Sequence, residues 1–181
     1  MRCSQRPASG AGDRGWRELL LAHHTAVREA LSHWGGTEHD AAGDGFFASF
    51  VGAARAIHCA QEIAERVASM GIDTRAGVHI GECELIDGKP GGIAVTIGAR
   101  LLGNAGPSEV VVSQTVKDLV AGSGFAFSGR REHELKGVPD RWRLYVADGC
   151  ATEATYTSQT AIAGASRRAF SVAVSRSPSA V

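Results

Sequence analysis

Apolar residues recur every three or four positions in two long segments, residues 13–34 and 53–70. This spacing places them on one face of an α-helix, so it predicts two amphipathic helices. Asp13 can cap the first helix, and Gly35-Gly36 ends it. A shorter segment, residues 93–102, predicts a third helix entered through two glycines, and residues 114–120 a fourth.

Alternation of apolar and polar residues predicts the strands. Residues 37–42 and 46–51 form the best-defined pair, because the Asp44-Gly45 dipeptide between them favours a tight hairpin turn. On the second strand, Phe46, Ala48 and Phe50 should share one face. The other strand candidates are residues 72–80, with residues 82–86 as their hairpin partner, and residues 109–113, 125–128, 131–135 and 141–147.

The order of these elements predicts one α+β domain, residues 13–147, with a ferredoxin-like antiparallel sheet and helices on one face. Residues 1–12 are small and polar, and we expect a loose N-terminal segment. Residues 148–181 are rich in Ala, Ser and Thr without a sustained period, which is typical of a disordered tail.

A ferredoxin-like plan normally begins with a strand before the first helix, but residues 1–12 contain no alternating apolar run. We therefore expect the first strand to be missing. Its neighbours would then carry unsatisfied backbone groups, at a cost of about 1–3 kcal/mol for each buried group. From the sequence we therefore expect that this chain is a fragment, or that its start has been placed too far downstream.

Composition limits the partners and the compartment. The nineteen basic residues balance the nineteen acidic ones, so no net charge favours binding to nucleic acid or to a membrane surface. No run of 18 apolar residues and no signal peptide is visible. Four scattered cysteines indicate reduced thiols, so we expect a cytoplasmic protein. The seven histidines show no metal-binding spacing and are interpreted as ordinary surface or core residues.

Three segments, residues 41–50, 91–100 and 134–139, resemble motifs of the class III adenylate and guanylate cyclases in their order and spacing. The resemblance covers roughly residues 12–147. It implies a phosphorus-oxygen lyase of signal transduction, which joins the ribose 3′-hydroxyl of a nucleoside triphosphate to its α-phosphate and expels pyrophosphate. It also implies Mg²⁺ or Mn²⁺ as cofactor in a two-ion site.

The resemblance assigns roles to four residues. Asp44 would be the second metal-binding carboxylate, while the first would lie on the missing strand. Arg100 would brace the α-phosphate, and Lys136 would hold the terminal phosphates. Thr96 stands where the family usually has an Asn or His that positions the ribose. Without the resemblance, Asp44 is a turn former and both cations are solvated surface charges.

Base recognition by the family would fall on Asp40 and Lys89. In adenylate cyclases a Lys precedes the hairpin turn and an Asp or Thr precedes the third helix. Here the two charges are exchanged. The alternative interpretation of this pair is ordinary surface charge.

In this family the metal-binding carboxylates come from one subunit, whereas residues of the Arg100, Thr96 and Lys136 type come from its partner. The resemblance therefore implies a homodimer, or a heterodimer with another cyclase-like domain.

The predicted function is a nucleotide cyclase with ATP as the expected substrate and GTP left open. The first alternative is a catalytically degenerate relative that acts as a nucleotide-binding or dimerising regulatory module. The second is an unrelated ferredoxin-like scaffold whose motifs match by chance.

Overall fold

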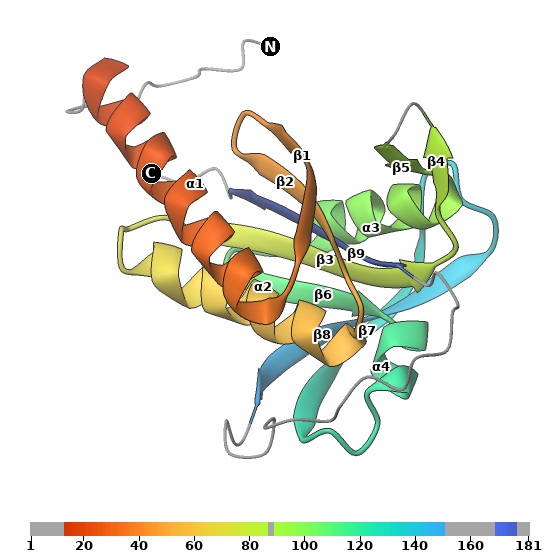
Figure 1. Cartoon of the computed structure of the whole chain (residues 1–181). Coiled ribbons are helices and arrows are strands. Elements are labelled where there is room, and N and C mark those ends of the chain that lie inside the picture. Colours follow the sequence, from red (N-terminus) through yellow and green to blue (C-terminus); the bar gives the residue numbers. More distant parts are fainter. Residues whose placement is uncertain (1–12, 87–88, 151–168, 177–181) are drawn as a thin grey trace, which may run out of the picture.

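The computed structural model describes residues 13–86, 89–150 and 169–176 (Figure 1). Within them, the helices are α1 (Asp13–Trp34), α2 (Ala53–Ala68), α3 (Ile93–Asn104) and α4 (Gln114–Leu119). The strands are β1 (Thr37–Ala42), β2 (Gly45–Phe50), β3 (Thr74–Gly81), β4 (Glu84–Ile86), β5 (Lys89–Gly91), β6 (Glu109–Ser113), β7 (Phe125–Glu134), β8 (Arg141–Cys150) and β9 (Ala169–Arg176). The main sheet has the order β1-β2-β9-β3-β6-β8-β7, and β4 pairs with β5 alone. The predicted α+β class is confirmed.

The last described strand, β9, lies in the middle of the main sheet. It pairs antiparallel with β2 on one side and with β3 on the other. From the sequence we expected this central strand to be missing, because no segment ahead of α1 could form it. Residues 169–176, which belong to the segment interpreted as a disordered tail, form a strand at this place. The remainder of that segment and residues 1–12 lie outside the described residues, apart from Asp148–Cys150, which end β8.

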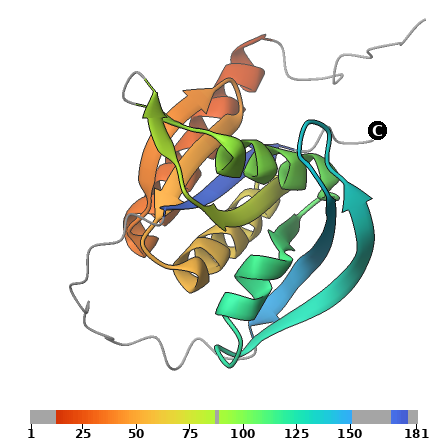
Figure 2. The same ribbon diagram turned by 90° about the vertical axis from the view of Figure 1, so that its right-hand side faces the viewer.

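Helices cover both faces of the sheet rather than one. On one face, α1 and α2 pack with β2 residues Phe46, Ala48 and Phe50 in the larger apolar cluster. On the other, α3 contributes Ile97 and Leu101 to a smaller cluster, and Figure 2 shows α3 in front of the sheet. The β pleat explains the division, because alternate side chains of the central strands point to opposite faces.

Gly77 of β3 allows α3 to approach the sheet closely. A Cβ atom there would lie 2.5 Å from the backbone nitrogen of Leu102 and 2.6 Å from the carbonyl oxygen of Gly98. Any larger residue would therefore push α3 away from β3.

Three local predictions were wrong. Residues 125–134 form one strand whose register shifts between Gly129 and Glu132, not two strands. Residues 84–86 pair with β5 and not with β3. Strands β3 and β6 are parallel, so the sheet is mixed. None of the helices in the described residues is long and apolar enough to cross a membrane.

Candidate active site

Asp44 lies at the tip of the β1–β2 hairpin. Ala42 pairs with Gly45, so the two turn residues are Gly43 and Asp44, one position earlier than the predicted Asp44-Gly45 turn. Gly43 has φ = 62°, a conformation that glycine adopts without strain. The Asp44 side chain is half-buried, and its carboxylate makes no hydrogen bond or ion pair with the described residues.

The exchanged charges, Asp40 and Lys89, meet in the structure. Lys89 Nζ lies 3.1 Å from an Asp40 carboxylate oxygen, and both side chains are more than half exposed. They stand beside a pocket of about 230 Å³ lined by His39, Asp40, Phe47, Lys89, Pro90, Val95 and Ala99. A pocket with apolar walls and one acid–base pair suits a planar heterocycle with both donors and acceptors.

His39 also lines this pocket, whereas the sequence analysis interpreted it as an ordinary surface or core residue. Its Nε2 lies 2.6 Å from Ser49 Oγ, and its ring lies against Phe47 with centroids 5.7 Å apart. Partial burial lowers the pKa of His39, so the neutral ring is favoured. A lone histidine in a short strand carries no signal that would have distinguished it from a surface residue.

Arg100 and Lys136 also come together, although they are 36 positions apart. Arg100 Nε donates a hydrogen bond to the Lys136 carbonyl oxygen at 2.9 Å. Both side chains are exposed, and among the described residues the Nη atoms of Arg100 form no hydrogen bond. Lys136 belongs to the β7–β8 turn, whose residues line an open hollow of about 700 Å³. Lys136 lines this hollow with Arg141 and with the acidic residues Glu134 and Asp140, and Arg100 adjoins it through the bond to the Lys136 carbonyl oxygen. Guanidinium and ammonium groups are the side chains that bind phosphate oxygens.

Thr96 lies one helical turn before Arg100, as predicted from their spacing. Its hydroxyl donates to the Gly92 carbonyl oxygen at 3.3 Å. This local bond satisfies the hydroxyl within α3, so a ligand would have to compete with it or share its lone pairs.

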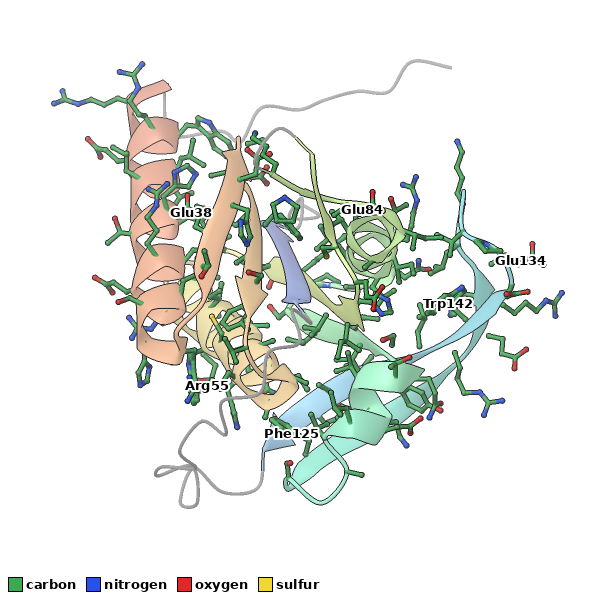
Figure 3. The ribbon with its side chains drawn as sticks, turned by 45° about the vertical axis from the view of Figure 1, so that its right-hand side comes forward. Glu38, Arg55, Glu84, Phe125, Glu134 and Trp142 are labelled. Carbon is green, nitrogen blue, oxygen red and sulfur yellow. The ribbon has the colours of Figure 1, made fainter. Side chains whose placement is uncertain are left out.

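Asp44 and Arg100 do not meet within one chain. The β1–β2 hairpin forms one edge of the sheet and the β7–β8 hairpin the other. By strand register, the Asp44 turn and the Lys136 turn also lie at opposite ends of the strands. Figure 3 shows Glu38 of β1 and Glu134 of β7 on opposite sides of the domain.

The described residues do not fit a two-ion metal centre. They contain no group of three or more His, Cys, Asp or Glu side chains arranged to hold a metal. Strand β9, which runs beside β2, has the sequence AFSVAVSR and contains no carboxylate. Asp44 alone fits a single Mg²⁺ or Mn²⁺ ion that arrives with a triphosphate, because Mg²⁺ is often held by one carboxylate plus phosphate and water oxygens.

A buried polar pair, His79 and Ser113, lies under α3. Both residues are at least 96% buried, and His79 Nδ1 is 2.9 Å from Ser113 Oγ. Burial lowers the pKa of His79 to about 4. The His79 ring meets Trp142 edge to face at 5.5 Å, and Trp142 Nε1 donates to the Pro139 carbonyl oxygen at 2.9 Å. The pair thus supports the turn that carries Lys136.

Solved structures of cyclase domains share this architecture. An adenylate/guanylate cyclase/hydrolase from Silicibacter pomeroyi superposes with a TM-score of 0.67 and 26% identity, over 73% of this chain and 82% of its own. The guanylate cyclase domain of RhGC from Catenaria anguillulae, in complex with GTP, gives 0.64 and 18%, over 79% and 88%. The chain contains a cyclase-like domain. The adenylyl cyclase CyaB from P. aeruginosa matches less closely, with a TM-score of 0.57 and 17% identity, over 78% of this chain and 85% of its own.

Curated relatives of the cyclase-like domain carry no described activity. Uncharacterized proteins Mb0915c of Mycobacterium bovis and Rv0891c of Mycobacterium tuberculosis are each 35% identical over 128 residues, which is 66% of this chain. The chain spans 44% of the length of each. No family model matches the sequence.

Proposed function

We propose that this cyclase-like domain, paired with a second one, converts a nucleoside triphosphate to its 3′,5′-cyclic nucleotide and pyrophosphate. ATP is the expected substrate. The observation that carries the proposal is the contact between Arg100 and the backbone of Lys136, which gathers two cations one helical turn from Thr96. The likeness to solved cyclase domains supports the same reaction class.

In this reaction the 3′-oxygen bonds to the α-phosphorus and the bond from that phosphorus to the bridging oxygen breaks. Pyrophosphate leaves with the electron pair, and the hydroxyl proton passes to solvent. Arg100 would stabilise the charge that develops on the α-phosphate, since its planar guanidinium suits phosphate oxygens. Lys136 would hold the departing phosphates, and Thr96 would orient the ribose.

Asp44 of the second subunit would hold one Mg²⁺ or Mn²⁺ ion against the triphosphate. When bound, this ion neutralises phosphate charge and makes the hydroxyl more acidic. The pocket beside Asp40 and Lys89 would take the base. Their exposed ion pair can open at little cost, because such pairs contribute about 0–1 kcal/mol.

The test is incubation of the purified protein with Mn²⁺ and either ATP or GTP, followed by chromatography of the nucleotides. The proposal expects a 3′,5′-cyclic product and an equal amount of pyrophosphate. Binding of nucleotide without any cyclic product, at any protein concentration, would contradict it and would leave the regulatory alternative.

A further inference from the structure

Two consecutive histidines of α1 reach the turn that carries Asp44. His23 Nε2 lies 3.2 Å from the Asp44 carbonyl oxygen, and His24 Nε2 lies 2.8 Å from the Gly43 carbonyl oxygen. Carbonyl oxygens only accept, so each Nε2 must carry the proton. Both turn residues are therefore tied through their backbones to the same helix.

Phe46, two residues after Asp44, is held by the same histidines. The His24 ring packs edge to face against it, with centroids 4.9 Å apart at 86°, and the His23 ring lies 5.9 Å away. Phe46 is only 4% exposed. The backbone around Asp44 is thus fixed at the turn and again at Phe46.

These contacts leave the Asp44 carboxylate itself unused, since it forms no hydrogen bond or ion pair with the described residues. We propose that His23 and His24 are positioning residues, which hold the turn so that the Asp44 carboxylate meets a triphosphate-bound divalent cation. Without the histidine contacts, this two-residue turn at the edge of the sheet would be free to move relative to the sheet. This inference rests on the proposed function, because it assumes the cation.

Arg28 provides the matched control. It contacts the same hairpin from the same helix, because its guanidinium donates two hydrogen bonds to the Glu38 carboxylate at 2.9 and 3.0 Å. Its Cζ atom also lies 5.6 Å from the centre of the Phe46 ring. It does not bond to the turn carbonyls. An Arg28→Met variant therefore loosens the contact between α1 and the hairpin without removing the histidine bonds.

The experiment measures Mn²⁺ affinity by electron paramagnetic resonance in the presence of a non-hydrolysable ATP analogue. His24 is half-buried, so its variants should fold, and thermal melts verify this. His24→Met should weaken Mn²⁺ binding about tenfold, as loss of outer-shell support for a metal ligand does. His24→Gln, whose side-chain amide can donate at a similar reach, should restore most of the affinity, and Arg28→Met should bind as the wild type does.

Wild-type affinity in His24→Met, or an equal loss in Arg28→Met or His24→Gln, would overturn the positioning role. An Asp44→Asn variant separates this failure from that of the proposed function. If Asp44→Asn loses Mn²⁺ while His24→Met keeps it, only the positioning role is wrong. If Asp44→Asn also binds normally, the assigned cation site is wrong, and the positioning role with it.

Discussion

At the hairpin, Asp44 is half-buried on a turn whose carbonyls accept hydrogen bonds from two histidines. Arg100 and Lys136, at the other edge of the sheet, are exposed and share a single bond through Arg100 Nε. One corner thus presents a fixed carboxylate, while the other presents two adaptable cations. Neither corner is a complete site by itself, and the proposed function therefore requires a second subunit.

The two cations that we propose to be catalytic are exposed, whereas the residues that stabilise the fold are buried. Substitution of an exposed cation should reduce turnover and leave the fold intact. Substitution in the α1–α2 core should do the reverse.

Arg100→Ala should show the largest effect on turnover. Loss of a donor that stabilises transition-state charge typically costs about 10²–10³-fold in kcat. Arg100→Lys should recover only part of it, because an ammonium lacks the guanidinium fork. Since the side chain is exposed, stability should change by less than about 0.5 kcal/mol in urea unfolding. A variant as active as the wild type would remove Arg100 from the site.

Ile57→Ala should show the opposite behaviour. Ile57 is fully buried in the cluster beneath α2, and the cavity should cost about 3 kcal/mol of unfolding free energy. Nucleotide affinity, measured well below the melting temperature, should stay within about twofold of wild type, because the cluster lies on the face away from α3. A large loss of affinity in the folded variant would break the separation of the two faces.

His79 should make stability depend on pH. Burial lowers its pKa to about 4, against 6.5 for the unfolded chain. Between these values the unfolded state binds a proton that the native state does not. His79 therefore contributes stability that is fully present above pH 6.5 and is lost as the pH falls toward 4, by up to about 3 kcal/mol.

Urea unfolding at several pH values tests this prediction against His79→Gln. The difference in stability between the two proteins should shrink as the pH falls from 6.5 to 4. A constant difference would show that His79 is protonated equally in both states.

Lys89→Met should have the smallest effect. The exposed pair with Asp40 adds at most about 1 kcal/mol to stability. If Lys89 donates to the base, nucleotide affinity should fall about tenfold in calorimetric titration, as for a hydrogen bond from a charged donor. Lys117→Met, on α4, is the control and should bind normally. Equal affinities of the wild type and both variants would exclude a contact between Lys89 and the base.

Local patterns predicted the helices well, because their signals lie within a few residues. The apolar spacing of residues 53–70 and the glycines before Ile93 anticipated α2 and α3 closely. The central strand was missed for the opposite reason. The segment 169–176 is short and lies far in sequence from the strands with which it pairs. No pattern within the segment indicates that it lies between β2 and β3.

The resemblance assigned Asp40 and Lys89 to base recognition, and Arg100 and Lys136 to the phosphates. In the structure the members of each pair lie side by side. Their roles remain predictions. His23 and His24 could not be found from sequence, because they contact a turn about twenty residues away and show no metal-binding spacing.

Mixing two inactive variants tests the central claim, a site shared between subunits, most directly. Asp44→Asn and Arg100→Ala should each abolish cyclic nucleotide formation as homodimers. After mixing under conditions that exchange subunits, half the dimers are mixed and one of their two sites is intact, so about a quarter of wild-type activity should return. If no activity returns while subunit exchange is verified, Asp44 and Arg100 do not meet across a dimer, and the account is wrong.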